Sequence, residues 1–382
     1  MSEAPVVVIG AGIAGLAAAY ELHRCGVTPI VLEASRRAGG LILTEREGPF
    51  VIDAGPDALL ATKPGGIALC EALGLGGRLM PTSPPRTSFV LRDGRLHPLP
   101  RPAVLGLPLT WRAAAGASML SLAGRARMAL EPLVRARFVP DESIGSFIGR
   151  RFGREAVDYI AEPLLAGIHA GDIERLAIFP LYPMLVDAEL TQGSVMKGLR
   201  ARGRSDTPAS PSASKAREGL FLSLPGGMGE LVQALEAALP PGTIHFGTRV
   251  GAVRKEDGPL FRVYQQESRL SCGVVVVAAP AWAAAEMLAP LDADLAALCG
   301  GISYTSSAIV TLAFDRHAVG DPLAGSGFVV PRAERMPLMA VTWISSKWSG
   351  RAPADSVLIR AFLGGARDPG AVDRSDAALI DT

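Results

Sequence analysis

Three glycines and one glutamate near the N-terminus have the types and spacing needed to bind a dinucleotide. In Gly10-x-Gly12-x-x-Gly15, the first glycine allows a tight turn and the second lets the backbone approach a pyrophosphate. The third lets a helix pack closely on a strand, and the positive end of that helix faces the phosphates. Glu33 could accept hydrogen bonds from a ribose 2′-hydroxyl and would repel a 2′-phosphate. A glycine-rich turn that binds nothing is the alternative. The elements around the motif distinguish this turn from a dinucleotide site.

Those elements fit a strand–helix–strand unit that binds a nucleotide. Pro5–Gly10 is apolar and β-branched, which predicts a buried parallel strand. Ala14–Cys25 has the apolar spacing of a helix, and Gly26 stands where a C-terminal cap belongs. Thr28–Leu32 predicts the second strand, with Glu33 at its end. The sequence therefore predicts a dinucleotide site.

Two later segments bear on the kind of dinucleotide, because the motif alone leaves FAD and NAD open. The pair Gly39-Gly40 follows the glutamate closely and could bring backbone near a second part of a long ligand. Asp53-Ala-Gly-Pro-Asp57 then follows the strand-like Phe50–Ile52. Both segments favour FAD.

The rest of the chain predicts a helical region followed by a strand-rich region. Ala201–Arg217 is polar and rich in Ser, Pro and Ala, which predicts a mobile loop. The pattern is mostly helical over Thr110–Glu189, with examples at Leu120–Val134, Ile144–Phe152 and Arg154–Leu165, and a later helix is predicted at Gly229–Leu239. Strands are predicted at Thr243–Val253, Pro259–Tyr264, Cys272–Ala279, Ser306–Phe314, Gly327–Val330, Leu338–Trp343 and Val357–Leu363.

The composition excludes some classes of function. Hydrophobic residues make up 49% of the chain, as in a folded protein with a large core. The 38 basic residues nearly cancel the 37 acidic ones, and only 5% of residues are aromatic, so we expect no nucleic-acid partner. The four cysteines and five histidines are scattered, so we predict no metal site and expect reduced thiols in a cytoplasmic protein.

We expect neither a secretory signal nor a transmembrane helix. Met1–Pro5 carries no basic stretch of the kind that begins a signal peptide. The longest uncharged window, Leu295–Phe314, is long enough to cross a bilayer, but its Ser, Thr and Gly content suits a strand and its approach better. Peripheral membrane contact stays open.

The motifs together resemble the flavin-dependent amine oxidase and phytoene desaturase superfamily. Within it, they are most similar to the oxygen-dependent protoporphyrinogen and coproporphyrinogen III oxidases of haem synthesis. The glycine motif is widely shared, whereas Gly55-Pro-Asp57 and the segment around Ile168 are more specific. Further matches stand in family order over nearly the whole chain, at Leu96-His-Pro-Leu-Pro100, Glu162-Pro-Leu-Leu-Ala-Gly-Ile-His-Ala-Gly-Asp172, Leu224-Pro-Gly-Gly-Met228, Gly247-Thr-Arg-Val250 and Val277-Ala-Ala-Pro280.

The resemblance implies an α/β plus α+β fold and FAD as cofactor. The parts would be a doubly wound, Rossmann-like FAD-binding domain (1–84 and 219–295), an inserted helical region that roofs the active site or contacts a membrane (100–200), a mobile loop (201–218) and a mixed-sheet substrate domain (85–99 and 296–370). The FAD contacts would be Gly10, Ala11, Gly12, Ile13, Ala14, Gly15, Glu33, Gly40, Leu41, Gly55, Pro56, Asp57, Ala58 and Val250. Relatives often carry a basic or aromatic residue where Leu41 stands. They also continue for several dozen residues beyond Thr382, with a last glycine-rich FAD segment.

The implied reaction is oxidation of a porphyrinogen by FAD and O2, giving H2O2, with no catalytic nucleophile or acid–base pair required. Lys63 would anchor a substrate carboxylate, although an ordinary exposed lysine is as good an interpretation. Gly167, Ile168, Met339 and Phe362 would contact the macrocycle, although helix packing and plain core are their alternatives. Further candidates for these roles are Arg86, Arg95, Ala170, Gly171, Thr342 and Trp343. His169 could donate a proton or stack, with a structural or solvated histidine as the alternative. Arg200, Arg202 and Arg204 form a small basic run, with a solvated loop as its default interpretation.

Other functions remain open from the residues alone. Another flavin oxidoreductase of the superfamily, such as an amine oxidase or a carotenoid desaturase, is the first alternative. A flavin-free, non-catalytic fragment is the second, and a colourless purified protein would support it. The sequence does not choose between the two porphyrinogens, and a homodimer stays open.

Overall fold

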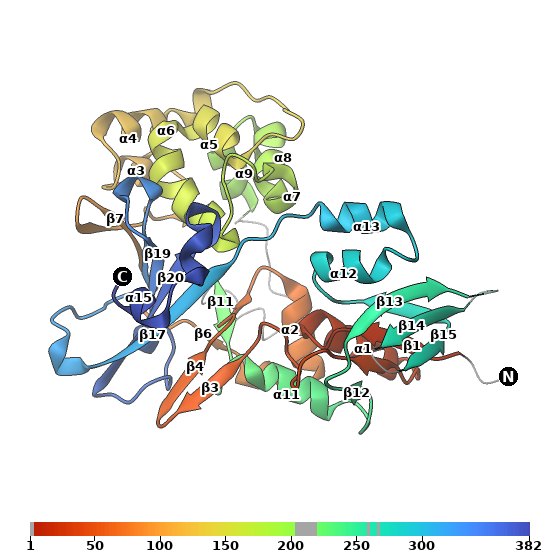
Figure 1. Cartoon of the computed structure of the whole chain (residues 1–382). Coiled ribbons are helices and arrows are strands. Elements are labelled where there is room, and N and C mark those ends of the chain that lie inside the picture. The colour runs from red at the N-terminus through yellow and green to blue at the C-terminus, as the bar shows by residue number, and fades with distance from the viewer. Residues whose placement is uncertain (1–3, 203–219, 257, 259, 266–267) are drawn as a thin grey trace. The chain divides into compact units, whose positions relative to one another are not determined.

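The computed structural model describes residues 4–202, 220–256, 258, 260–265 and 268–382. The described residues form two compact units, each made of two stretches of chain (Figure 1). The first unit combines Met1–Pro81 with Pro211–Tyr304, and the second combines Thr82–Ser210 with Thr305–Thr382.

A four-stranded parallel sheet forms the centre of the first unit, in the order β12–β2–β1–β16. Its strands and first helix are β1 (Val6–Ile9), α1 (Ile13–Arg24), β2 (Ile30–Leu32), β12 (Ile244–His245) and β16 (Val274–Val277). Val7 and Val8 are both fully buried but belong to different core clusters, because successive side chains of a strand point to opposite faces. Burial on both faces explains the continuous apolar run, and the predicted strand–helix–strand unit is confirmed.

Smaller sheets and four more helices complete the described part of the first unit. The helices are α2 (Pro64–Ala72), α11 (Gly229–Ala237), α12 (Ala281–Leu288) and α13 (Ala293–Gly300), with a 3₁₀ turn at Gly76–Arg78. The small sheets are β3–β4 (Thr44–Glu47, Phe50–Asp53), β5–β11–β6 (Leu59–Leu60, Phe221–Ser223, Met80–Pro81) and β13–β14–β15 (Val250–Lys255, Phe261–Gln265, Arg269–Cys272).

The single strand predicted at Thr243–Val253 was wrong. β12 and β13 belong to different sheets, and the chain turns between them at Gly247, whose φ of +64° suits glycine. The N–H of Gly247 donates to the carbonyl oxygen of Ser35 over 2.9 Å, and that of Thr248 donates to the carbonyl oxygen of Glu33 over 2.8 Å. These bonds hold the turn beside the end of β2, so a continuous strand cannot form.

A mixed six-stranded sheet forms the centre of the second unit, in the order β17–β20–β19–β18–β7–β8. β18 and β7 run parallel, and every other neighbouring pair is antiparallel. Its strands are β7 (Ser88–Arg92), β8 (Arg95–Pro98), β17 (Ser307–Asp315), β18 (Gly327–Val329), β19 (Leu338–Trp343) and β20 (Ser356–Gly364). Leu323, Val341, Trp343 and Val357 pack as a buried cluster with this sheet.

The helices of the second unit gather at one end of its sheet (Figure 1). They are α3 (Trp111–Ala115), α4 (Leu122–Ala129), α5 (Ile144–Phe152), α6 (Arg154–Ala156), a π-helix (Val157–Ala166), α7 (Ile178–Leu181), α8 (Pro183–Gln192) and α9 (Val195–Arg202). Shorter elements are β9–β10 (Ala103–Val104, Leu107–Pro108), α14 (Ile344–Lys347), α15 (Asp376–Ile380) and 3₁₀ turns at Glu131–Leu133, Gly167–His169, Arg316–Ala318, Arg332–Glu334, Gly365–Arg367 and Pro369–Asp373.

The prediction of a helix at Ile144–Phe152 is confirmed, whereas three neighbouring predictions need correction. The helix at Leu120–Val134 is shorter, because α4 ends at Ala129 before a turn that contains Pro132. The helix at Arg154–Leu165 widens into the π-helix from Val157 onward. The loop predicted from Ala201 begins inside α9, and its remainder lies outside the described residues.

The uncharged window Leu295–Phe314 divides between α13 and β17, so its first part is helix instead of an approach to a strand. In the described part of the chain, every helix is too short or too polar to cross a membrane.

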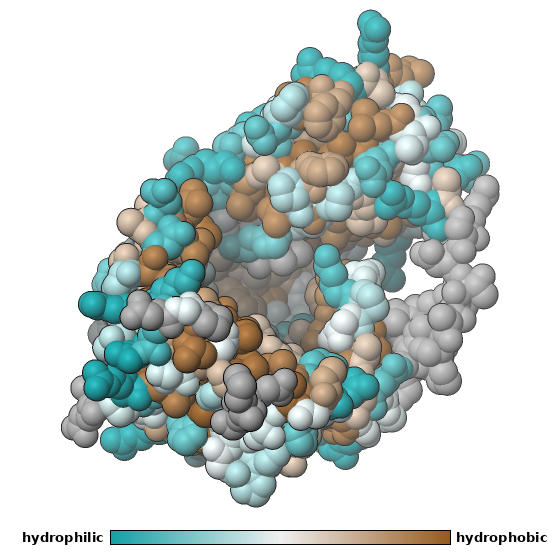
Figure 2. Space-filling view, turned by 90° about the vertical axis from the view of Figure 1, so that its right-hand side faces the viewer, coloured by the Kyte–Doolittle hydropathy of each residue, from teal (hydrophilic) through white to brown (hydrophobic). Residues whose placement is uncertain are grey.

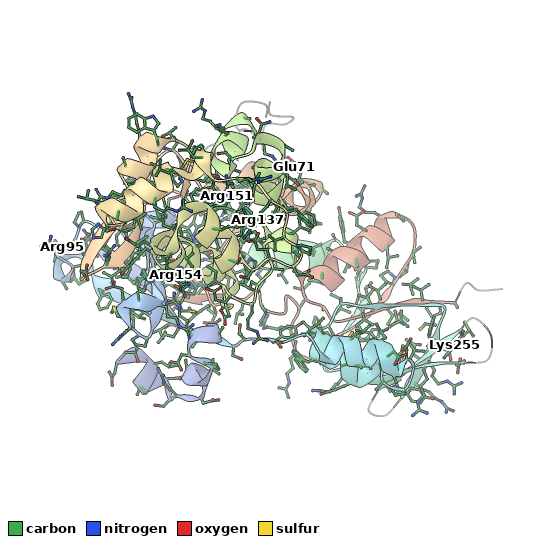
Figure 3. All side chains as sticks on the ribbon, turned by 90° about the horizontal axis from the view of Figure 1, so that it is seen from above. Glu71, Arg95, Arg137, Arg151, Arg154 and Lys255 are labelled. Atoms are coloured by element: carbon green, nitrogen blue, oxygen red, sulfur yellow. The ribbon has the colours of Figure 1, made fainter. Side chains whose placement is uncertain are left out.

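The helical part of the second unit encloses a buried charge network. Glu131, Arg151 and Glu189 are fully buried, and Figure 3 shows Arg151 and Arg137 lying near each other among the helices. Arg151 pairs with Glu131 and places Nη1 3.4 Å from Oε1 of Glu189. Arg150 places Nη1 2.5 Å from the same oxygen of Glu189. Hydrogen bonds between these groups offset much of the cost of burying their charges.

Candidate functional site

Two glycines of the motif are required by the backbone around them. Gly10 has a φ of +103°, and a Cβ there would stand 2.9 Å from the carbonyl oxygen of Ala278. A Cβ at Gly15 would stand 1.8 Å from the carbonyl oxygen of Gly10, so the helix could not pack on the strand with any other residue. At Gly12, by contrast, a Cβ would meet only Cα of Gly40, at 4.0 Å. Space for a ligand therefore remains at the start of α1.

The double glycine lies directly on the motif loop. The N–H of Gly39 donates to the carbonyl oxygen of Ala11 over 2.8 Å, and Gly39 forms a parallel bridge with Gly12. Both residues of the pair have positive φ, +97° at Gly39 and +57° at Gly40. A Cβ at Gly40 would stand 3.1 Å from Cα of Gly12, so the close approach of the two loops favours glycine. The structure thus brings Gly40 to the motif loop.

Glu33 is held at the same place by backbone donors. Its Oε2 accepts from the N–H of Ala11 over 2.6 Å, and its Oε1 accepts from the N–H of Ser35 over 2.8 Å. Partial burial raises the pKa of this carboxyl, but hydrogen bonds from Ala11 and Ser35 outweigh it, so the pKa lies below its usual value. The ionised carboxylate keeps acceptor capacity for a ribose hydroxyl. Val250 follows the turn beside Glu33 and is buried with Ile9 and its neighbours.

The Gly55-Pro-Asp57 loop contacts the double-glycine segment. A Cβ at Gly55 would stand 1.8 Å from the carbonyl oxygen of Leu41, so the two loops touch through backbone. The side chain of Leu41 is 86% exposed, and Pro56 is exposed as well, whereas Ala58 is half-buried. The carbonyl oxygen of Asp57 accepts from Oγ of Ser223 over 2.6 Å. The loops at Gly10–Gly15, Gly39–Leu41 and Gly55 therefore approach one another through backbone, and Ile13 and Ala14 supply the first turn of α1.

Sequence reasoning missed the hydrogen bonds that join the strands before the Gly55-Pro-Asp57 loop to the segment at Met228 and Gly229. Oδ1 of the buried Asp53 accepts from the N–H of Met228 over 2.9 Å and from Oγ1 of Thr44 over 2.5 Å. Oγ1 of Thr44 in turn accepts from the N–H of Gly229 over 2.8 Å. The Leu224-Pro-Gly-Gly-Met228 motif marked one side of this contact, but nothing local marked its pairing with Asp53.

The substrate candidates divide between the two units. Lys63 is exposed and precedes α2 in the first unit. In the second unit, the carbonyl oxygen of Ala170 accepts from the N–H of Ala366 over 2.7 Å. A Cβ at Gly365 would meet Cβ of Ala170 at 3.0 Å and Sδ of Met339 at 3.1 Å.

The structure therefore brings the bend at 167–171 to Met339 and to the end of the strand that carries Phe362, which is half-buried and pairs with Ala340. Gly167 opens this bend with space around it, since a Cβ there would meet nothing within 4 Å. The side chain of Ile168 lies outside the described part.

His169 stands on this bend beside Tyr182. Its Nε2 lies 3.4 Å from the hydroxyl of Tyr182, which donates to the carbonyl oxygen of Leu165 over 3.2 Å. Burial lowers the pKa of His169 and raises the pKa of Tyr182 to about 12. Both groups are therefore neutral near pH 7.

The weaker candidates are placed as follows. Trp343 is core, with its ring 5.8 Å from that of Phe89, while Thr342 is half-buried on the same strand. Nε of Arg86 donates to the carbonyl oxygen of Thr82, and Arg95 is exposed on β8. Gly171 contacts Leu176, Arg202 pairs with Asp187, Arg200 is exposed on α9, and Arg204 lies outside the described residues.

The first strand–helix turn of the parallel sheet carries Gly10, Gly12 and Gly15, here called the glycine cradle, and an acid ends the second strand. These features define a dinucleotide-binding α/β protein. Residues 13–382 match the sequence profile described as "Flavin containing amine oxidoreductase". The chain belongs to this family. FAD is its cofactor, and the open space at Gly12, the double glycine and Glu33 fit that molecule.

Individual relatives agree with this membership. The coproporphyrinogen III oxidase of Bacillus subtilis is 33% identical over 383 residues, which are 98% of this chain and 80% of that protein. Protoporphyrinogen oxidase 2 of Arabidopsis thaliana is 28% identical, over 95% of this chain and 75% of its own. The crystal structure of a proposed protoporphyrinogen oxidase from an Exiguobacterium species superposes with a TM-score of 0.85 at 31% identity, covering 100% of this chain and 81% of the other.

Proposed function

We propose that this chain oxidises coproporphyrinogen III to coproporphyrin III in haem synthesis, with O2 as the acceptor and H2O2 as a product. Protoporphyrinogen IX is the second substrate to test. One observation carries the proposal. The glycine cradle occurs in a chain that is similar over nearly all its length to enzymes named for porphyrinogen oxidation. Coproporphyrinogen III is placed first because the relative named for it is 33% identical, against 31% and 28% for the two named for protoporphyrinogen.

The residues of the first unit would bind and orient the cofactor. The N–H groups in the first turn of α1 have no partner inside the helix and would bind the pyrophosphate, while Glu33 would hold the ribose. Gly40, Leu41 and the Gly55-Pro-Asp57 loop would pass along the ligand through their backbone. Bound FAD supplies the acceptor for a hydride in each two-electron step.

The residues of the second unit would form most of the substrate site. A porphyrinogen is a broad apolar ring with carboxylates on its rim, and its full oxidation removes six electrons in three such steps. Gly167, Ile168, Met339 and Phe362 would meet the ring, and Lys63 would anchor a carboxylate. These residues would position the ring and exclude water. No further catalytic group is needed, because the oxidation requires no nucleophile.

A peripheral membrane contact through the helical part of the second unit belongs to the same proposal. Large apolar side chains are exposed there, with Leu122 and Leu133 at least 80% exposed and Trp111 and Phe138 more than half exposed. The upper part of Figure 2 shows brown patches interrupted by teal on the face it displays. Co-sedimentation with vesicles containing anionic lipid should exceed that with neutral ones, because Arg112 and Arg125 are near Trp111 and Leu122 in sequence. A cytoplasmic location agrees with four free cysteines, and a homodimer is to be tested by light scattering.

The proposed function is tested by porphyrin fluorescence. The purified chain is supplied with FAD, O2 and coproporphyrinogen III, then separately with protoporphyrinogen IX, beside a control without enzyme. We expect fluorescence to rise above autoxidation, faster with coproporphyrinogen III. Gly15→Val should abolish the rise, whereas Gly77→Ala should keep it, because a Cβ at Gly77 meets nothing within 4 Å. A yellow protein that leaves both substrates at the autoxidation rate would contradict the proposal.

A further inference from the structure

The bend at 167–171 follows a helix that is tied to the sheet by one ion pair. Glu162, on the π-helix, accepts from Arg367 in the fork geometry of a bidentate pair, Oε1 from Nε over 2.8 Å and Oε2 from Nη2 over 2.6 Å. Arg367 lies in the turn just after β20. The two residues are 205 positions apart in sequence, so the pair joins distant parts of the second unit.

Both members of the pair are nearly buried and use most of their hydrogen-bonding capacity. The side chains are 12% exposed at Glu162 and 14% exposed at Arg367. Nη1 of Arg367 also donates to the carbonyl oxygen of Val330 over 2.7 Å, and Oε2 of Glu162 accepts from the N–H of Arg332 over 3.1 Å. A buried pair with this geometry fixes position as well as charge, because either partner alone would be costly to keep out of water.

The helix that carries Glu162 has an uncommon form. Val157–Ala166 is a π-helix with Pro163 inside it, next to Glu162. Proline lacks an N–H and interrupts the ordinary helical hydrogen bonding, and extended π-helix is rare and often stands at functional sites. Contacts outside the helix must therefore help to hold its last turns, and the bond to Arg367 is placed to do so.

The other end of the bend is tied to the same end of the sheet. The carbonyl oxygen of Ala170 accepts from the N–H of Ala366 and also from Oγ1 of Thr305, over 3.3 Å. Ala366 and Arg367 are neighbours, so one short turn after β20 holds the chain on both sides of Gly167–His169. Loss of the Glu162 contact would remove the tie to this turn on one side of the bend, while the bonds of Ala170 on the other side remain.

We propose that Glu162 and Arg367 are positioning residues, which hold the 167–171 bend as a wall of the porphyrinogen site. This inference rests on the proposed function. Neither residue takes part in electron or proton transfer. Their effect passes through the bend to the place where the macrocycle sits, so substrate binding should respond more than the chemical step.

The test compares Glu162→Gln, Arg367→Gln, the double variant and Arg367→Lys with the wild type. Asp158→Asn is the matched control, because Asp158 lies one turn earlier on the same helix and pairs with the exposed Arg154, over 2.9 Å. For each FAD-loaded protein we would measure KM and kcat for coproporphyrinogen III, Tm, and hydrogen exchange of peptides covering 162–171.

We expect Glu162→Gln to raise KM about tenfold or more, with kcat within about twofold of the wild type. Exchange should speed up at 162–171 and stay unchanged at Ile144–Phe152. The double variant should be no worse than either single one, Arg367→Lys should recover part of the loss, and Asp158→Asn should match the wild type.

Two results would overturn the inference alone. One is a Glu162→Gln protein with wild-type KM and wild-type exchange, and the other is a double variant whose loss is the sum of the two single losses. If Glu162→Gln or Arg367→Gln does not fold, Arg367→Lys is the deciding variant, because lysine keeps the positive charge but cannot form the bidentate pair. An unchanged KM in Arg367→Lys would then reject the positioning role. A wild-type chain that does not oxidise porphyrinogens would instead overturn the proposed function, and this inference with it.

Discussion

Replacing Glu189 by glutamine should destabilise the second unit strongly. Glu189 is fully buried on α8, where Oε1 accepts from Nη1 of Arg150 over 2.5 Å and Oε2 accepts from Nη2 over 2.7 Å. Oε1 also accepts from the N–H of Arg137 over 3.1 Å. Glutamine has nearly the same shape, but it removes the charge and directs an NH₂ group at a guanidinium donor.

The expected magnitude follows from the burial of the partners. Arg151 is fully buried and lies within reach of Glu189, so the substitution leaves positive charge in the core with less compensation. Removing one partner of a buried ion pair costs about 3–5 kcal/mol. For a unit of roughly 200 residues, that corresponds to a fall in Tm of about 6–20 °C.

Thermal unfolding followed by circular dichroism, at the same FAD saturation, measures this change. Asp187→Asn is the matched control, because Asp187 lies two residues away on α8 and pairs with Arg202 over 3.2 Å, with both side chains about half exposed. Such surface pairs contribute about 0–1 kcal/mol, so its Tm should move little. Equal shifts in both variants, or a fall below about 2 °C for Glu189→Gln, would refute the reasoning.

Three further predictions concern the first unit. Gly15→Ala should abolish FAD binding, because its Cβ would stand 1.8 Å from the carbonyl oxygen of Gly10; flavin absorbance after gel filtration measures this, and a fully yellow variant would contradict it. The lowered pKa of Glu33 means that its contribution to the unfolding free energy is present above the unfolded pKa of about 4.3 and is lost as pH falls through the folded value. Denaturant titrations from pH 7 to about pH 3 should therefore show that Glu33→Gln loses less unfolding free energy in acid than the wild type does. Equal losses in the two proteins would contradict this prediction. Burial raises the pKa of Cys70 to about 11, so iodoacetamide should label the exposed Cys25 before Cys70, as peptide mass spectrometry would reveal.

The parts of the fold that the sequence predicted well are those specified by nearby residues. Gly10, Gly12 and Gly15 act within one turn of chain, and Glu33 ends the next strand, so the cradle could be predicted from spacing and residue type. Sheet strands with strong apolar alternation, such as Leu338–Trp343, were predicted for the same reason. Gly247 shows where this reasoning stops, because its turn is fixed by hydrogen bonds to Glu33 and Ser35, more than two hundred residues earlier.

The missed features all depend on pairs that are distant in sequence. Asp53 meets Met228, Glu189 meets Arg150, and Glu162 meets Arg367. Each of these carboxylates, seen alone in the sequence, is an ordinary acidic residue that would be expected at the surface. The π-helix also has no periodicity that a sequence pattern would reveal, since its first residues match an α-helix equally well.

The interleaving of the two units has a consequence for synthesis on the ribosome. β1 lies between β2 and β16 in the central sheet, yet β12 and β16 begin only at Ile244 and Val274. At about 5–20 residues per second, β1 and β2 would wait roughly 10–50 s for their outer neighbours. During that time the nascent chain exposes two unpaired strand edges, which are templates for aggregation. Recombinant expression at low temperature or with trigger-type chaperones should therefore raise the yield of folded protein, through protection of an unfinished sheet.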